Sequence, residues 1–218
     1  MSDCCDRAGY HTVFSERFAR RVARTYCRRG LDRTQRRLVT FLTERGIEHA
    51  SVLEIGGGVG EIQIELLSRG ARKATNLEIS RNYEAAAAAL LKQSGMADRV
   101  TRRLVDIASS SDDVEPADVV VLHRVVCCYP DYERLLSAAA SHAKRLLVFS
   151  HPPRNLLTRA ILVCENSLHR LRGSDFRAFV HPPNAMIKTA EAQGMSVSYR
   201  RRGVSWHVVG LERLSPSI

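Results

Sequence analysis

The sequence predicts an α/β protein with a doubly wound, mostly parallel seven-stranded sheet, an N-terminal helical arm and an inserted lid helix. From residue 51 onward, short β-rich runs alternate with helical segments. A glycine-rich turn joins the first run to a helix, and the last two runs are close enough in the chain to pair as a hairpin. A chain of 218 residues suits one compact unit. We expect residues 1–48 to form the arm and residues 49–218 to form the sheet domain.

The arm is predicted to be helical over residues 13–45, in two segments. Gly30 interrupts the helical pattern, and a second helix begins at residues 31 and 32. Arginines fill most of the polar positions of the first segment. Its apolar residues recur at helical spacing: Val13, Phe14, Phe18, Val22 and Tyr26.

Seven predicted strands follow, separated mostly by helices. The strands cover residues 51–55, 74–78, 100–105, 117–122, 145–150, 195–201 and 205–214, and the helices cover 61–68, 81–94, 131–143, 154–172 and 184–193. A tight turn at Arg202 and Gly203 reverses the chain, so we expect the last strand to be antiparallel. The inserted helix 154–172 breaks the alternation, and one of its faces is apolar: Leu157, Ala160, Ile161, Cys164, Leu168 and Leu171.

Composition and charge narrow the class of protein. The chain is 44% hydrophobic and 26% charged, a globular balance, and its apolar runs are too short to span a membrane. The start of the sequence does not resemble a signal peptide, so we expect a cytoplasmic location. The net charge is +10, and residues 1–45 hold eleven arginines against five acids. Such an arm favours an anionic partner, namely phosphate, carboxylate, nucleic acid or anionic lipid; the alternative is a solvated basic face.

The six cysteines are expected to be reduced thiols. They form two vicinal pairs and contain no Cys-x-x-Cys motif. A metal site at Cys4, Cys5 and Cys27 would rest on sequence proximity alone, so we expect no metal.

The glycine turn after the first strand differs from the common phosphate-binding turns. Its sequence runs from Val52 to Gly60 as Val-Leu-Glu-Ile-Gly-Gly-Gly-Val-Gly. The third glycine of a dinucleotide-binding turn is absent, since Glu61 or Gln63 stands at that position, and no Gly-Lys-Ser/Thr follows. The carboxylate of Glu54 would repel a diphosphate. The turn therefore predicts a positively charged ligand.

Acidic residues also end the next two strands. Glu78 follows the turn by eighteen residues, where an acid accepts hydrogen bonds from ribose hydroxyls in doubly wound sheets. Asp106 and Ile107 end the third strand, positioned to bind an exocyclic amine and to pack on an adenine ring. Together these residues predict a cationic adenosine that bears an amino acid; the alternative is a structural glycine turn with unrelated acids.

These motifs resemble those of the Rossmann-like S-adenosylmethionine-dependent methyltransferases over about residues 49–213. The resemblance implies that S-adenosyl-L-methionine is the co-substrate, with its methionine part near Gly56, Gly58 and Gly60. It also implies that Glu78 holds the ribose and that Asp106 lies at the adenine. The remaining residues expected to bind the co-substrate are Glu54, Ile79, Ile107 and His123.

A narrower resemblance is to the magnesium-protoporphyrin O-methyltransferases, which methylate a propionate carboxylate. It rests on the arm, on Tyr129-Pro130 after the fourth strand, and on the run 147–149 before the inserted helix. Two departures weaken it: Cys128 stands where that family has histidine, and Glu54 with Gly57-Gly58 replaces its usual Asp-x-Gly-Cys-Gly turn. The porphyrin is thus one candidate acceptor among others.

We expect the acceptor to lie over the end of the fourth strand. His123 is the candidate base or acceptor-binding donor, with a structural role as the alternative. Tyr129 is a candidate to orient the acceptor, with packing against the inserted helix as the alternative. The arm and the inserted helix should close over this exit as a lid. The pocket beneath it should have apolar walls and cationic edges, formed by Tyr10, Phe14, Arg17 and Arg154.

The sequence therefore favours a methyltransferase that acts on a small-molecule acceptor, on the oxygen of an anionic aromatic, porphyrin-like or quinone-like compound. A nucleic-acid methyltransferase is the first alternative, supported by the basic arm and by Arg200-Arg201-Arg202. The Asn/Asp-Pro-Pro-aromatic tetrad typical of base amino-group methylation is absent after the fourth strand. A catalytically inactive S-adenosylmethionine-binding module is the second alternative. Peripheral membrane contact and the oligomeric state stay open.

Overall fold

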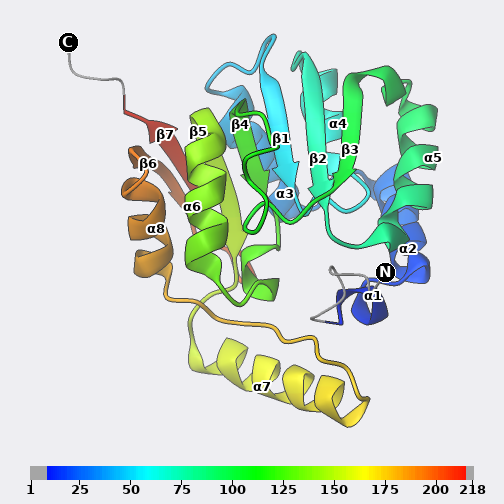
Figure 1. Ribbon diagram of the computed structural model, residues 1–218, viewed down its shortest axis with the longest axis vertical. Coiled ribbons are helices and arrows are strands. Elements are labelled where there is room, and N and C mark those ends of the chain that lie inside the picture. Colours follow the sequence, from blue (N-terminus) through cyan, green and yellow to red (C-terminus); the bar gives the residue numbers. More distant parts are fainter. Residues whose placement is uncertain (1–8, 215–218) are drawn as a thin grey trace.

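The computed structural model describes residues 9–214 and contains one seven-stranded sheet (Figure 1). Its strand order is β3-β2-β1-β4-β5-β7-β6, and β7 is antiparallel to both of its neighbours while the other pairs are parallel. The predicted fold class is confirmed. The strands are β1 Ser51–Ile55, β2 Lys73–Glu78, β3 Val100–Leu104, β4 Ala117–Leu122, β5 Ala143–His151, β6 Met195–Arg201 and β7 His207–Arg213.

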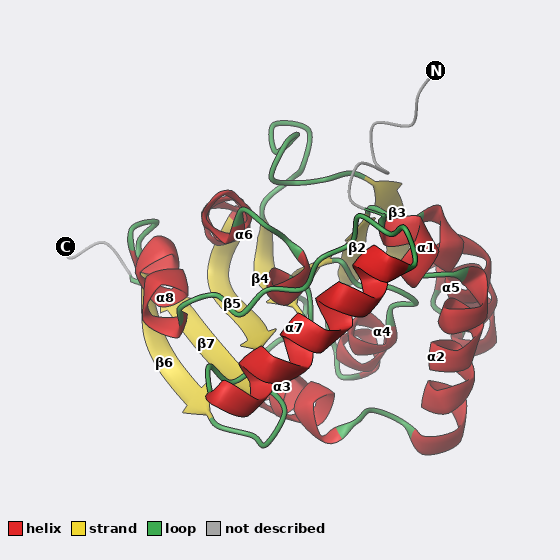
Figure 2. Ribbon diagram, turned by 90° about the horizontal axis from the view of Figure 1, so that it is seen from below, coloured by secondary structure: helices red, strands yellow, loops and turns green. Residues whose placement is uncertain are grey.

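Helices cover both faces of the sheet, as Figures 1 and 2 show. Helices α6 and α8 lie on one face, and α3, α4 and α5 lie on the other, with α2 packed against α5. The helices are α1 Tyr10–Val13, α2 Glu16–Arg29, α3 Arg33–Thr43, α4 Glu61–Ser68, α5 Glu84–Ser94, α6 Tyr132–His142, α7 Leu156–Leu171 and α8 Pro183–Glu191. Three short 3₁₀ turns, Arg81–Tyr83, Ala97–Arg99 and Val126–Cys128, complete the set among the described residues.

The core follows from the alternation of side chains along the central strand β4. Val120 and Leu122 are fully buried toward α6, where they join Leu136. Val119 and Val121 are equally buried toward the other face, where they join Leu38 and other residues of α3. Because successive side chains of a strand point to opposite faces, a continuous apolar run is required where helices cover both sides.

The break in the arm is built from local capping. Gly30 ends α2 with a φ of 66°, a left-handed value that favours glycine. The Asp32 side chain then accepts hydrogen bonds from the backbone of Thr34 and Gln35, while the Gln35 side chain accepts one from the Asp32 amide. This reciprocal capping box begins α3.

The connection between β6 and β7 differs from the prediction. Residues 202–206 form it, instead of a two-residue turn at Arg202 and Gly203. The backbone of Trp206 passes close to Gly203. A Cβ at Gly203 would stand 2.3 Å from the carbonyl oxygen of Trp206, which leaves no room for a side chain. The loop therefore folds back on itself before β7 begins.

Helix α7 stands apart from the layered domain, below the carboxyl edge of the sheet (Figure 1). None of its residues is buried, so the predicted apolar face of the inserted helix does not pack onto the domain. The opposite side of α7 makes the contact: the Asn166 side chain exchanges hydrogen bonds of 2.8 and 2.9 Å with the backbone of Ala178. In residues 9–214 no helix is long and apolar enough to cross a membrane.

Candidate functional site

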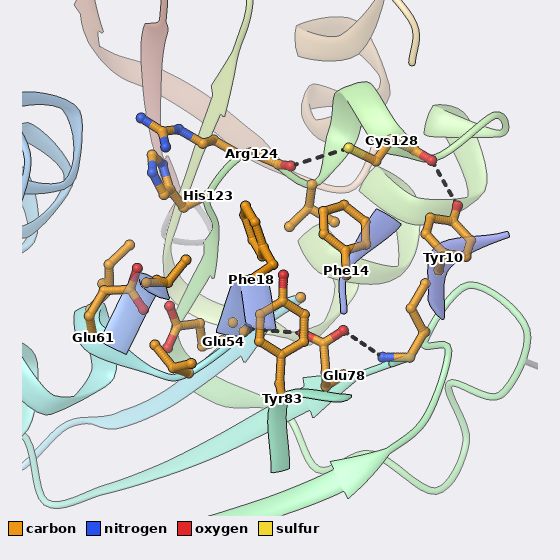
Figure 3. A pocket seen from close by; sticks show the side chains of 18 of the residues that line it. Tyr10, Phe14, Phe18, Glu54, Glu61, Glu78, Tyr83, His123, Arg124 and Cys128 are labelled. Atoms are coloured by element: carbon orange, nitrogen blue, oxygen red, sulfur yellow. Dashed lines mark hydrogen bonds between the residues drawn. The ribbon is translucent and has the colours of Figure 1, made fainter. Parts of the chain in front are cut away.

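A pocket opens at the carboxyl edge of the sheet, between the glycine turn after β1 and the N-terminal arm (Figure 3). It lies beside β1 and β4, whose following connections run to opposite faces of the sheet. Such a topological switch point is where open α/β sheets bind ligands. The lining residues are Tyr10, Phe14, Phe18, Val22, Gln35, Glu54, Gly56, Gly57, Gly58, Val59, Glu61, Ile62, Glu78, Ile79, Tyr83, His123, Arg124, Val125, Cys128 and Tyr129.

The glycine turn has a backbone that side chains would disturb. Gly56 and Gly58 have φ values of 61° and 56°, in the left-handed region. A Cβ at Gly56 would stand 2.6 Å from a methyl group of Val125. A Cβ at Gly58 would stand 3.2 Å from the ring of Tyr83. Glycine here keeps the floor of the pocket bare, so that a ligand can approach the backbone.

Glu78 ties the end of β2 to this turn. Its Oε2 accepts a hydrogen bond of 2.9 Å from the Gly58 amide, and its Oε1 accepts from the amides of Ile79 and Ser80. Burial raises the pKa of the Glu78 carboxyl, and these three hydrogen bonds oppose the rise. Each carboxylate oxygen can accept more than one hydrogen bond, so the group remains able to bind ligand hydroxyls at the pocket wall.

Two further carboxylates, Glu54 and Glu61, line the same pocket. Burial raises the pKa of Glu54 well above its usual range, and the nearby Glu61 adds to the rise. Burial also raises the pKa of Glu61, although the Gln35 side chain donates a hydrogen bond of 2.7 Å to it. A buried carboxylate without a cation is costly. Arg102 lowers the pKa of Glu54 and Glu78 in part, and Arg124 lowers that of Glu61. A cationic adenosine of the kind that the sequence predicts would stabilise the three ionised carboxylates further.

Asp106 and Ile107 do not line the pocket. The Asp106 carboxylate accepts hydrogen bonds from the Tyr129 hydroxyl at 2.8 Å and, within its own turn, from the Ala108 amide. Ile107 is 1% exposed and belongs to the hydrophobic core. The turn after β3 thus engages the acid in hydrogen bonds within the protein and places the isoleucine in the core. Their contacts with an adenine stay a prediction.

His123 lines the pocket as an uncharged, half-buried imidazole. Its Nδ1 lies 3.0 Å from the Ser150 hydroxyl, and its Nε2 is buried without a hydrogen-bond partner among the described residues. Burial, reinforced by the Arg124 guanidinium, lowers the pKa of His123 to about 3. The ring is therefore neutral at physiological pH, and its Nε2 is closed off from solvent in this structure.

Arg124, which sequence reasoning missed, shapes the same wall. It has a φ of 60°, unusual for a residue with a side chain, and its amide donates to the Ser150 hydroxyl at 2.9 Å. Its guanidinium forms a 2.7 Å ion pair with Asp32 and lies 5.1 Å from the Trp206 ring centroid. The ion pair between Arg124 and Asp32 thus joins the segment after β4 to the start of α3. No local sequence pattern reveals this contact.

Tyr129 contributes its ring to the pocket wall, but its hydroxyl points elsewhere. The hydroxyl donates to Asp106, and burial together with this hydrogen bond raises the pKa of Tyr129 to about 12. The ring packs against the main core. The hydroxyl is thus engaged with Asp106, and the contact of Tyr129 with an acceptor stays a prediction.

The N-terminal arm closes one side of the pocket. The Tyr10 hydroxyl donates a 2.7 Å hydrogen bond to the Cys128 carbonyl oxygen (Figure 3). The Asn82 side chain donates to the carbonyl oxygens of His11 and Phe14. Aromatic rings from three parts of the chain meet there: Tyr10, Phe14, Phe18, Tyr83 and Phe176. The structure places Tyr10 and Phe14 in the wall, and Phe176, which follows α7, supports them from outside.

The two arginines predicted at the pocket lie elsewhere. Arg17 is exposed on the outer face of α2, beside Arg21 and Arg24, because Phe14, Phe18 and Val22 occupy the inner face. Arg154 precedes α7 and lines a separate groove near β6 and β7. The cationic edge of the pocket is formed by Arg124 instead.

Sequence reasoning also missed Phe18, Val22, Gln35, Glu61 and Tyr83 as lining residues. The helical spacing of Phe14, Phe18 and Val22 does mark one face of the arm, but not what that face covers. Cys4 and Cys5 lie outside the described residues, and Cys27 is exposed with its sulfur 3.6 Å from Gln93. No cluster of three metal-ligating side chains occurs between residues 9 and 214.

Comparisons with known proteins agree with this geometry. Residues 18–207 match a family model described as a methyltransferase domain. No curated protein matches the sequence significantly.

Several solved structures share the fold. One is magnesium protoporphyrin IX methyltransferase from Synechocystis PCC 6803 with bound SAH, with 22% identity, 83% of this chain and 82% of that chain covered, and a TM-score of 0.67. Another is an O-methyltransferase family protein from Burkholderia thailandensis, with 18% identity and a TM-score of 0.73. That match covers 96% of this chain and 64% of the Burkholderia chain. A third is an O-methyltransferase family 2 protein from Planctomyces limnophilus in complex with apigenin, with 16% identity and a TM-score of 0.62. That match covers 85% of this chain and 63% of the Planctomyces chain.

Proposed function

Because this chain belongs to the methyltransferase-domain family and uses S-adenosylmethionine as co-substrate, we propose that it methylates a carboxylate oxygen of an aromatic small molecule. The co-substrate supplies an electrophilic methyl group on a positively charged sulfur. The acceptor is an anionic planar compound. This class includes magnesium protoporphyrin IX, for which the Synechocystis enzyme of the same fold is named. The co-substrate lies over the glycine turn, between Glu54 and Glu78.

The residues around the turn bind the co-substrate in this proposal. Glu54, Glu61 and Glu78 offset its positive charges, and the bare backbone of Gly56 and Gly58 lets it approach the sheet edge. The chain does not need to protonate the leaving group, since the sulfur departs neutral. Its main contribution is to hold the acceptor oxygen in line with the methyl group, and such positioning supplies roughly 7–11 kcal/mol.

The neutrality of His123 is the observation that supports a carboxylate acceptor most directly. The carboxylates that line the pocket surround the glycine turn, where the co-substrate binds in this proposal. His123 is the only histidine among the described lining residues, so it is the remaining candidate for a base. With a pKa of about 3, His123 is a poor base. Taking a proton from a phenol, whose pKa is about 10, would therefore be strongly unfavourable. A carboxylic acid has a pKa of about 4 and is already ionised at neutral pH.

The walls of the pocket suit a planar acceptor. Tyr10, Phe14, Phe18 and Tyr83 present aromatic surface. Arg124, whose guanidinium is paired with Asp32, and the neutral ring of His123 lie at the same wall, close to where the acceptor group would bind. Aromatic walls with few polar groups are typical of sites for planar small molecules. In this role His123 is a neutral binding group that orients the acceptor.

The test is a methyl-transfer assay with purified protein, S-adenosylmethionine labelled in its methyl group, and a small-molecule extract. We expect the label in an aromatic product that releases it as methanol in mild alkali, because methyl esters hydrolyse there and methyl ethers do not. A Gly58→Val variant serves as the negative control. A product whose label survives alkali would contradict the carboxylate proposal.

The same assay separates the alternatives. Label in the RNA fraction would identify a nucleic-acid methyltransferase. Binding of S-adenosylmethionine without any labelled product across extracts would identify an inactive binding module. We favour the small molecule because the pocket is enclosed by the aromatic residues of the arm.

A further inference from the structure

Helix α7 exposes a broad apolar surface. Leu156, Leu157 and Leu171 are 82%, 70% and 84% exposed, and Ile161, Val163 and Leu168 are also exposed. No described residue covers this surface. Contiguous exposed apolar surface of this kind marks a site of interaction with a protein or a membrane.

The exposed apolar residues of α7 share one arc of the helix, which also contains Ser167, whereas Leu162 lies outside it. At 100° per residue, the arc runs from Val163 through Leu156, Leu171 and Leu157 to Ile161. The opposite side contacts the domain through Asn166 and His169. Arginines border the arc on both margins, and Glu165, the only acid of the helix, lies outside the arc. The bordering arginines are Arg159, Arg170 and Arg172.

A basic groove lies next to the start of α7. Its lining includes Arg154, Arg200, Arg201 and Arg202, and no carboxylate lines it. None of these four guanidinium groups forms an ion pair or a side-chain hydrogen bond within residues 9–214. Val204, in the loop between β6 and β7, is 94% exposed. The groove therefore combines unpaired positive charge with a projecting apolar side chain.

The helix and the groove belong to the same side of the molecule. Strand β6 ends and β7 begins at the carboxyl edge of the parallel strands, where β5 also ends. Figure 2, seen from below, shows α7 in front of this edge, spanning it diagonally. The 16 residues of α7 measure about 24 Å, too short to cross a bilayer but suited to lie in its surface.

We propose that this protein docks on an anionic phospholipid bilayer through α7, with the apolar arc in the interface and the arginine groove on lipid phosphates. An in-plane helix with an apolar arc and arginine margins binds membranes in this way. A second copy of the chain would bring the marginal arginines of two α7 helices together, at a cost in like-charge repulsion. A nucleic acid would leave the apolar arc exposed, and α7 offers no aromatic rings for base stacking except His169.

Docking in this orientation has a consequence for the pocket. The pocket opens at the same carboxyl edge, and Phe176, just after α7, packs on Tyr10 and Phe14 of its wall. The aromatic part of an acceptor would then pass between bilayer and pocket without crossing bulk water. The docking proposal itself does not depend on which acceptor is methylated.

Vesicle flotation of the full chain tests the proposal. Vesicles of phosphatidylcholine alone are compared with vesicles of equal parts phosphatidylcholine and phosphatidylglycerol. We expect binding to the anionic vesicles only, weakened by high salt because the phosphate contacts are screened. Failure of the wild-type protein to bind the anionic vesicles would overturn the proposal.

Two sets of variants locate the contact. The combination Leu156→Ser, Leu157→Ser and Leu171→Ser should weaken vesicle binding by roughly a hundredfold, through loss of buried apolar surface. The combination Arg200→Gln and Arg202→Gln should weaken it by about twentyfold at low salt. The matched controls are Leu214→Ser and Arg72→Gln, exposed residues at the opposite edge of the sheet, which should bind as the wild type does.

Light scattering and a thermal unfolding curve complete the test. The serine variant should unfold at the same temperature as the wild type, since its leucines make no buried contact. If the wild type is instead a dimer that the serine changes dissociate, with no vesicle binding, the surface binds a second copy and the membrane proposal is wrong. Tight, salt-dependent binding of RNA in the absence of vesicle binding would overturn it equally.

Discussion

The Gly58 amide donates a 2.9 Å hydrogen bond to the Glu78 carboxylate, which joins the glycine turn after β1 to the end of β2. The same carboxylate accepts from the amides of Ile79 and Ser80, so the acid organises two strand ends at once. The pocket floor and its acidic wall are therefore one hydrogen-bonded unit. Changes to either residue should affect co-substrate binding first.

Glu78→Gln should weaken co-substrate binding by roughly 1–3 kcal/mol, because the amide nitrogen cannot accept the hydrogen bonds that the carboxylate oxygen accepts. Isothermal calorimetry with S-adenosylhomocysteine measures the change. The control is Glu115→Gln, since Glu115 is exposed and distant from the turn. Equal affinities of the Glu78 variant and the wild type would contradict the role we give this acid.

Gly58→Val should abolish co-substrate binding and destabilise the fold by about 1–2 kcal/mol, because valine is strained at a φ of 56°. Gly95→Val is a control matched for strain. Gly95 has a φ of 67° at the end of α5, with open space around it. It should lose similar stability in urea unfolding yet bind S-adenosylhomocysteine normally. If both variants lost binding, strain alone would explain the effect of Gly58.

Tyr10→Phe should loosen the arm over the pocket, since it removes the hydrogen bond to the Cys128 carbonyl and leaves the ring in place. We expect a loss of about 0.5–1.5 kcal/mol in the free energy of unfolding, together with a higher KM for the acceptor. Tyr132→Phe is the matched control, because its hydroxyl bonds only the adjacent Glu133 at the surface. An unchanged stability and KM in the Tyr10 variant would show that the arm is not held by this contact.

His123 should make the folded state sensitive to acid. Its folded pKa of about 3 lies below the unfolded value of about 6.5, so the unfolded chain binds more protons between these values. Stability contributed by the neutral ring is thus present above pH 6.5 and is lost as the pH falls toward 3. From pH 7 to pH 4.5 the loss is about 2–3 kcal/mol.

Comparison with His123→Gln isolates this contribution in urea unfolding at the two pH values. The comparison is needed because Glu54, whose pKa is raised by burial, acts in the opposite sense: its protonated form stabilises the fold at low pH. The variant should lose less stability on acidification than the wild type. Identical pH dependence of the two proteins would mean that His123 is not buried in its neutral form.

The fold class and the type of ligand followed from local patterns, whereas the order of the strands in the sheet came from the structure. The apolar run of β4, the alternation of strands and helices, and the acid beside the glycine turn each carry their information within a few residues. Periodicity also located the inserted helix correctly. It did not reveal that the apolar arc of α7 faces outward, because a hydrophobic face has the same pattern whatever covers it.

By itself, then, the sequence determined the sheet, the glycine turn and the charge of the co-substrate, since these depend on neighbouring residues and on the geometry of parallel strands. Only the tertiary structure decided that Arg124 reaches Asp32, that Tyr129 bonds Asp106, and that Arg17 and Arg154 lie away from the pocket. Each of these facts depends on where side chains from distant segments meet. Long-range packing determines these contacts, and the periodicity of the sequence does not indicate them.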